Sequence, residues 1–105
     1  MKIDLDGWGR LFRKVKYKKR AEIRIRRNLS KYERLGDVLL ALEDLLKDNP
    51  ETEKSELVGQ VNDKAFRVIR TDPDFNAPGV TLLYYEEEYV VWIWAIKIDP
   101  PDDYL

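Results

Sequence analysis

The chain has 105 residues, which fits one domain and is too short for two of ordinary size. It contains neither cysteine nor histidine, which excludes disulfides, thiol nucleophiles and Ser-His-Asp or Cys-His catalysis, and leaves only carboxylates as zinc ligands. Its net charge of −1 is unevenly distributed: residues 1–34 hold 13 Lys/Arg and 4 Asp/Glu, whereas residues 35–105 hold 6 basic and 16 acidic residues. We therefore expect a single domain over residues 1–105, with a basic part and an acidic part and with no metal or cofactor.

The N-terminal residues 1–12 are interpreted as a peripheral extension of this domain. They lack the apolar stretch of a signal peptide, and the longest apolar run of the chain, residues 89–96, is far shorter than the roughly 20 residues of a membrane helix. We therefore expect a cytoplasmic protein with no membrane partner.

A short strand and two helices are predicted next. Val15-Lys16-Tyr17 alternates apolar and charged residues, as a strand does. Residues 18–34 show the apolar spacing of a helix, although Ile23 and Ile25 also alternate like a strand. Leucines at helical intervals predict a second helix over residues 35–47, which ends before Asn49-Pro50 because the residue before proline avoids helical angles. The two helices would form an αα-hairpin.

The remainder of the chain is predicted to be a loop followed by three strands. The polar segment 51–63 indicates a loop, and strands are expected over residues 65–70, 80–85 and 89–96, with a hairpin tip at residues 86–88. Trp92 and Trp94 share one face of the last strand, beside Tyr84 or Tyr85 across the hairpin. We interpret them as core residues, with a ligand platform as the alternative, or, if one is exposed, as a partner-binding surface. The expected fold class is α+β: a short N-terminal strand, an αα-hairpin and an antiparallel three-stranded meander.

The basic segment is a candidate nucleic-acid interface. Lysines and arginines supply most of the sequence-independent affinity of nucleic-acid-binding proteins, and aromatic residues such as Trp8, Phe12 and Tyr17 can stack on bases. The alternative for the lysines and arginines is a solvated helix face, and the alternative for the aromatic residues is packing in the core. The candidate phosphate-binding residues are Arg13, Lys14, Lys16, Lys18, Lys19, Arg20, Arg24 and Arg27.

Several phrases of the sequence resemble the RelE/ParE toxin superfamily of toxin–antitoxin pairs. Val15-Lys16-Tyr17 before Lys19-Arg20-Ala21-Glu22 is similar to that family's first strand and helix, and residues 45–50 are similar to the end of its second helix. Leu57-Val58-Gly59, residues 66–69 and Leu82-Leu83-Tyr84 are similar to its sheet. The resemblance covers residues 13–104 and implies a toxin that is neutralised by an antitoxin protein and acts on translation or on DNA gyrase.

The same resemblance bears on catalysis. RelE-type members cleave messenger RNA with arginines and lysines of the sheet and the tail, but here Thr81 stands at the third-strand arginine position and the tail, residues 99–104, is acidic. We therefore expect no ribonuclease activity. The remaining weak candidates for catalysis are Arg67, Arg70, Lys97 and Tyr104.

Three functional hypotheses follow. The chain is a RelE/ParE-like toxin with an antitoxin partner; or it is a non-catalytic module that binds RNA, DNA or a ribosomal surface through its basic N-terminal third; or it is an inert relative of the toxins that forms a homodimer through its opposed charges.

Overall fold

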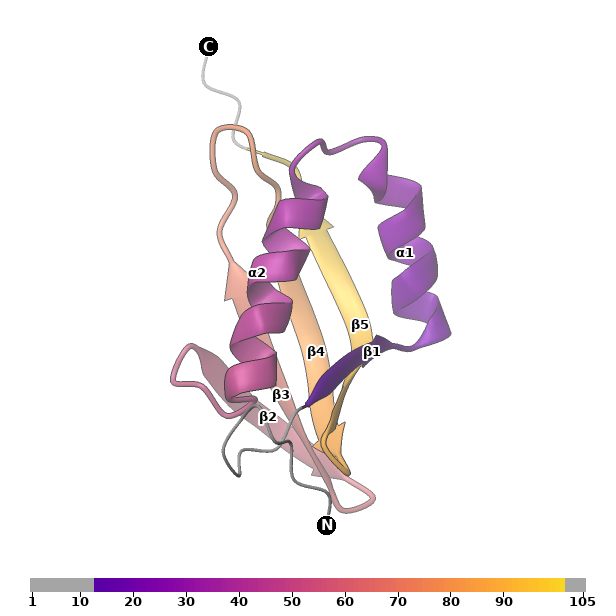
Figure 1. Cartoon of the computed structure of the whole chain (residues 1–105), viewed down its shortest axis with the longest axis vertical. Coiled ribbons are helices and arrows are strands. Elements are labelled where there is room, and N and C mark those ends of the chain that lie inside the picture. Colours follow the sequence, from indigo (N-terminus) through magenta and orange to yellow (C-terminus); the bar gives the residue numbers. More distant parts are fainter. Residues whose placement is uncertain (1–12, 102–105) are drawn as a thin grey trace, which may run out of the picture.

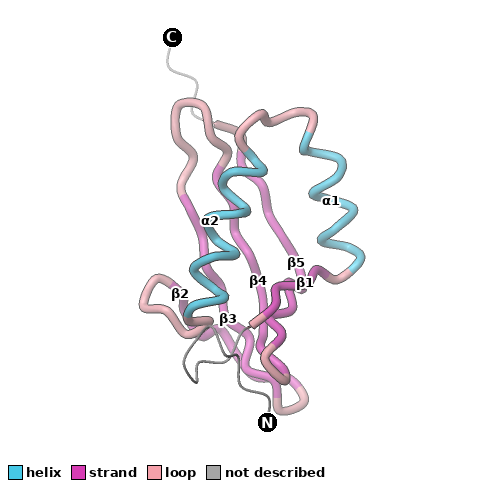
Figure 2. The backbone as a smooth tube through the Cα atoms, viewed as in Figure 1, coloured by secondary structure: helices cyan, strands magenta, loops and turns pink. Residues whose placement is uncertain are grey.

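A computed structural model describes residues 13–101 of the chain and shows an α+β fold (Figure 1). Within these residues two helices follow the first strand, and four more strands follow the helices (Figure 2). In chain order the elements are β1 (Lys14–Tyr17), α1 (Lys19–Leu29), α2 (Leu35–Asp48), β2 (Ser55–Val61), β3 (Lys64–Thr71), β4 (Gly79–Glu87) and β5 (Val90–Asp99).

All five strands belong to one mixed sheet with the order β1-β5-β4-β3-β2. β1 pairs in parallel with β5, with Tyr17 opposite Ile93, whereas the other neighbouring strands are antiparallel. Both helices lie on the same face of the sheet (Figure 1). In the described part of the chain no helix covers the opposite face, which is called the open face below.

The core lies between the helices and the sheet. Every second side chain of β4 points toward the helices, so Val80, Leu82 and Tyr84 are buried there. α2 buries one stripe of its surface at the three- and four-residue spacing of a helix. The buried residues of that stripe are Leu35, Leu39, Leu42 and Leu46.

The predicted fold class is confirmed, with one correction: the meander has four strands because residues 55–61, expected as a loop, form β2. This strand pairs with β3 at the edge of the sheet and buries only Ser55. Its burial pattern therefore lacks the alternation that marks a half-buried strand. A two-residue turn, Asn62-Asp63, joins β2 to β3, and both residues adopt positive φ angles of 49° and 66°.

The element boundaries also differ from the expected ones. α1 ends at Leu29 rather than at residue 34, because the carbonyl of Asn28 accepts the backbone N–H groups of Lys31 and Tyr32 in a tight turn. The strand alternative for residues 23–25 is wrong, since these residues lie within α1. No helix between residues 13 and 101 is long and apolar enough to cross a membrane.

Candidate functional site

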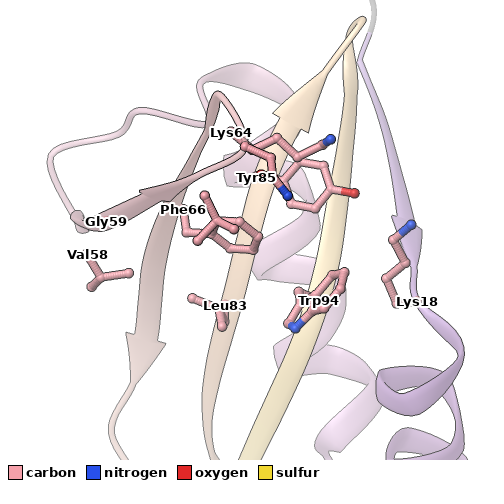
Figure 3. A pocket seen from close by; sticks show the side chains of 10 residues that line it. Lys18, Val58, Gly59, Lys64, Phe66, Leu83, Tyr85 and Trp94 are labelled. Atoms are coloured by element: carbon pink, nitrogen blue, oxygen red, sulfur yellow. The ribbon is translucent and has the colours of Figure 1, made fainter.

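The open face of the sheet carries a cluster of aromatic side chains. The rings of Phe66 and Tyr85 lie 5.1 Å apart, and Phe66 lies 6.0 Å from Trp94 at an interplanar angle of 88°. Trp94 also lies 6.4 Å from Tyr85. We call Phe66, Tyr85 and Trp94 the aromatic cluster; they come from three neighbouring strands (Figure 3).

A β-bulge brings Trp94 to this cluster. Leu83 lies opposite Ala95, but the next residue of β4, Tyr84, lies opposite Ile93, so Trp94 is the extra residue of β5. Tyr85 is only 4% exposed, whereas Trp94 is 39% exposed. The cluster is thus an ordered aromatic surface with one accessible indole.

Three lysines surround the aromatic rings. The Lys18 Nζ lies 4.4 Å from the centre of the Trp92 ring and 6.0 Å from that of Trp94, and the Lys16 Nζ lies 5.7 Å from Trp92. Lys64 lies 5.5 Å from the Tyr85 ring, and its Nζ forms an ion pair of 3.2 Å with Glu87. Cation–π contacts of this kind contribute about 0.5–1 kcal/mol each at exposed sites, so they hold the ammonium groups near the rings without neutralising their charge.

The aromatic cluster and two of the lysines line a groove of about 600 Å³ (Figure 3). Residues Val58 to Asn62 of the β2–β3 hairpin form one wall, and Lys18 lies on the other side, at the junction of β1 and α1. The lining residues are Lys18, Val58, Gly59, Val61, Asn62, Lys64, Phe66, Leu83, Tyr85 and Trp94.

A basic surface lies on α1, in addition to the lysines around the aromatic rings. Arg20, Arg24 and Arg27 follow one another at helical spacing, are exposed, and line a shallow depression of about 190 Å³. Among residues 13–101 none of the three forms an ion pair, and the same holds for Lys16, Lys18 and Lys19. β1 and α1 therefore form a basic margin of the sheet whose charges remain available to an anion (Figure 1).

Neither the protein-family models nor the curated proteins nor the solved structures contain a match to this chain. Its function is therefore inferred from the chemistry of the groove on the open face and of the basic margin.

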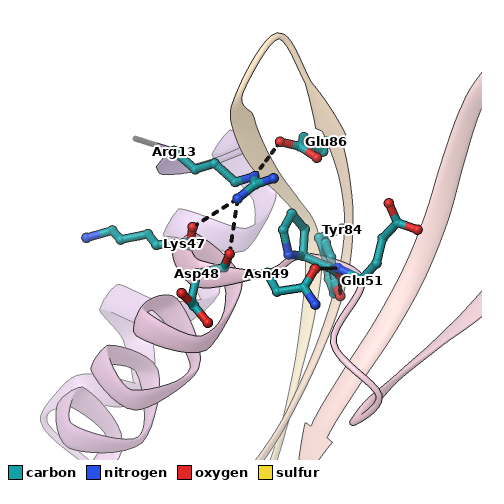
Figure 4. Close-up of polar contacts among 8 residues, drawn as sticks. Arg13, Lys47, Asp48, Asn49, Glu51, Tyr84 and Glu86 are labelled. Carbon is teal, nitrogen blue, oxygen red and sulfur yellow. Dashed lines mark hydrogen bonds and ion pairs between the residues drawn. The ribbon is translucent and has the colours of Figure 1, made fainter. Parts of the chain in front are cut away.

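The structure brings most of the predicted phosphate-binding residues to the basic margin, with Arg13 as an exception. The Arg13 Nε donates to Glu86 at 2.7 Å, and its Nη1 donates to the carbonyls of Lys47 and Asp48 at 3.4 and 3.1 Å (Figure 4). These contacts fix the start of β1 to the C-terminus of α2, where the helix dipole favours a cation. Arg13 is thus engaged in a structural contact.

The aromatic residues predicted from the N-terminal third are placed only in part. Trp8 and Phe12 lie outside the described residues. Tyr17 packs against the core on the helix side of the sheet, and its hydroxyl donates to the Glu43 carboxylate. Burial, together with Glu43, raises the pKa of Tyr17 above its ordinary value. Its role is that of a core residue, which was the alternative to base stacking.

The weak candidates for catalysis do not meet at one site. Arg67 lies opposite Tyr84 and donates to the Ser55 Oγ at 2.9 Å, on the helix side of the sheet. Arg70 and Lys97 flank Thr81 on the open face, two strands apart. Tyr104 lies outside the described residues. Within residues 13–101 no group of His, Cys, Asp or Glu side chains could hold a metal ion.

Trp92 and Trp94 lie beside Tyr85, as one of the two predicted arrangements requires, and Tyr84 points to the helices instead. Sequence reasoning missed the contribution of Lys64, Phe66 and Leu83 to the groove. The signal that could have found them is the Asn62-Asp63 turn, which would have placed β2 and β3 side by side.

Proposed function

We propose that this protein is a non-catalytic nucleic-acid-binding protein that contacts phosphates with the basic margin formed by β1 and α1. The observation that carries the proposal is a set of basic side chains on β1, on α1 and between them that form no ion pair with a carboxylate of residues 13–101. These residues are Lys14, Lys16, Lys18, Lys19, Arg20, Arg24 and Arg27.

The carboxylates of residues 13–101 form no ion pairs with these cations. On α1, Glu22 pairs with Arg26 at 2.7 Å, one helical turn away, and with none of the residues named above. The excess of acidic residues lies in the part of the sequence that follows α1. Local positive potential can therefore attract a polyanion although the net charge of the chain is −1.

Salt dependence of binding tests the proposal. Each phosphate contact releases counterions, so the logarithm of the binding constant should fall linearly with the logarithm of the salt concentration, with a slope of about −0.7 to −0.9 per contact. We would titrate fluorescent RNA and DNA oligonucleotides with the full chain at several salt concentrations. Absence of salt-dependent binding at low ionic strength would remove the proposal.

Matched charge reversals sharpen this experiment. Arg20→Glu with Arg24→Glu should lower the affinity and reduce the magnitude of the salt slope by about 2 units, since each lost contact removes about one unit. Lys31→Glu with Lys54→Glu changes the net charge equally at exposed positions outside the proposed surface. Equal loss of affinity in both double variants would contradict a localised interface.

A toxin-type component of a toxin–antitoxin pair is the second candidate. It is supported by the order of elements, a short strand followed by two helices and antiparallel strands, which is the order that the sequence resemblance implied. A groove of about 350 Å³ between α1 and α2, lined partly by Leu29, Leu39 and Leu40, is a surface that a neutralising partner protein could cover.

Growth of a bacterial host that expresses the chain from a tightly regulated promoter tests this second candidate. A toxin should arrest growth, with translation failing first for a ribosomal or messenger target and DNA synthesis failing first for gyrase. Normal growth with soluble protein present would count against it.

A further inference from the structure

We infer that the groove on the open face receives one unstacked nucleobase, so that the preferred ligand is a single-stranded nucleic acid. This inference rests on the proposed function and assigns the ligand class, whereas the phosphate contacts of the basic margin are indifferent to strandedness. It is carried by the aromatic cluster, which takes no part in the proposed phosphate contacts, together with Lys16 and Lys18 of the basic margin.

The shape of the aromatic cluster suits a flat, planar group. Trp94 and Phe66 meet at 88°, so they form a corner instead of a closed stack. A base can lie parallel to one ring while its edge meets the other ring. The 39% exposure of Trp94 leaves an accessible indole surface in a groove of about 600 Å³, and base–aromatic stacking is tolerant of sequence because every base has a π-face.

The charges around the groove suit the backbone of the same ligand. Lys18 lies on the groove wall near both indoles, and Lys16 lies close to Trp92. Lys64 is already paired with Glu87, so we assign the phosphate contacts to Lys16 and Lys18. Lys18 directly precedes α1 in the sequence. A nucleic-acid strand that leaves the groove at Lys18 can therefore continue along Arg20 and Arg24.

Among residues 13–101, the strand carboxylates that face the open side of the sheet lie away from these two lysines. By the strand register Glu56 faces the same side as Val68, on the far edge strand, and Asp99 pairs with Lys97 at 3.8 Å. Glu87 lies on the side of Lys64. A ligand that crosses the groove from β1 therefore meets cations first.

A duplex cannot use this groove. Its bases are stacked inside the helix, and a base must leave the stack before side chains can bind both its faces and its edge. A duplex would reach only the lysines and arginines of the margin. Discrimination between single strands and duplexes should therefore depend on Trp94, and general affinity should depend on α1.

Competition between single-stranded and duplex oligonucleotides of one length tests the inference, with tryptophan emission and fluorescence anisotropy as readouts. The wild-type chain should bind the single strand more tightly and show quenched emission. Trp94→Ala should weaken single-strand binding about 5- to 150-fold, the loss expected from one stacked base, and leave duplex binding unchanged. Preference for RNA or for DNA would identify the source of the strand, and either result supports the inference.

Two control variants keep the result interpretable. Trp94→Phe keeps an aromatic face and should retain most of the single-strand preference. Phe75→Ala removes an aromatic ring that is 57% exposed in the β3–β4 connection, outside the groove, and should behave as wild type. Circular dichroism of Trp94→Ala should report an intact fold, because Trp94 is 39% exposed on the open face and does not belong to the core between the helices and the sheet.

The outcomes separate the two proposals. Equal binding of single strands and duplexes, unaffected by Trp94→Ala, would overturn the base-binding groove while the proposed function stands. Absence of binding to either ligand at low salt would overturn both. Self-association that quenches Trp94 without nucleic acid would assign the groove to a second copy of the chain and would also overturn the inference.

Discussion

At the residue scale, Lys18 connects the two surfaces of the candidate interface. Its backbone N–H donates to the Ile93 carbonyl at 2.9 Å, and its own carbonyl accepts the Glu22 N–H at 3.0 Å as the first bond of α1. The backbone is thus tied on one side to β5 and on the other to the helix. The ammonium group, 4.4 Å from the Trp92 ring, is positioned by these bonds before any ligand binds.

Another residue-scale feature is the β4–β5 turn. Glu88 and Tyr89 adopt φ angles of 52° and 64°, a region that costs an ordinary side chain roughly 1 kcal/mol and that asparagine tolerates better. We expect Glu88→Asn to raise the free energy of unfolding by about 0.5–1 kcal/mol, measured by chemical denaturation. Glu53→Asn, at an exposed residue with negative φ, is the matched control. A gain as large in the control would contradict the strain argument.

At the element scale, α2 is the main apolar contact of the sheet. Leu42 is 2% exposed in the stripe that packs on the strands, whereas Leu40 is 58% exposed on the same helix. Leu42→Ala should lower the free energy of unfolding by about 2–5 kcal/mol, because it removes buried contacts and leaves a cavity. Leu40→Ala should change it by less than about 0.5 kcal/mol. Thermal denaturation of both variants checks the contrast, and comparable losses would show that α2 is not docked as described.

The sequence predicted the last three strands because they are short runs rich in apolar residues between turn residues, and the helices because their apolar residues recur at the spacing that burial on one side requires. α2 shows this most clearly. β2 could not be predicted in the same way, because an edge strand that leaves Leu57, Val58 and Val61 exposed carries no alternation of burial. The groove depends on that strand, so its wall was missed together with Lys64 and Phe66.

The basic margin was predictable from charge density alone, since Arg20, Arg24 and Arg27 adjoin one another on α1. The position of Lys16 and Lys18 over Trp92 was not predictable from local sequence. It depends on the parallel pairing of β1 with β5, which are at opposite ends of the chain. Local spacing contains no information on such a pairing.

At the scale of the whole molecule, two phenols make stability depend on pH at the alkaline end: Tyr84, which is buried in the core, and Tyr17, which is partly buried against it. Burial raises the pKa of both Tyr17 and Tyr84 above the ordinary value of 10.0. Their stabilising effect is therefore complete below pH 10 and is lost as pH rises above it, because the unfolded chain ionises first. Above that point the free energy of unfolding should fall with pH, by at most about 1.4 kcal/mol per pH unit for each phenol and by less for Tyr17, which is only partly buried.

Tyr17→Phe separates this effect from the titration of the lysines, because the variant and the wild-type chain have the same lysines. The variant should lose stability with pH less steeply above pH 10 than the wild-type chain, as measured by urea denaturation at a series of pH values. Parallel curves for the two proteins would show that Tyr17 ionises with equal ease in the folded state.

The parallel pairing of β1 with β5 also has a consequence during synthesis. On the ribosome β1 and α1 emerge before the other described elements, but the strand that must hold β1 in the sheet, β5, emerges after all of them. Contacts between residues so far apart in the sequence form late, because ordering the long segment between them costs conformational entropy before the contacts can stabilise the fold. The basic residues are therefore exposed on a nascent chain that still lacks Trp92 and Trp94, and the combined lysine–indole surface first exists when translation of β5 is finished.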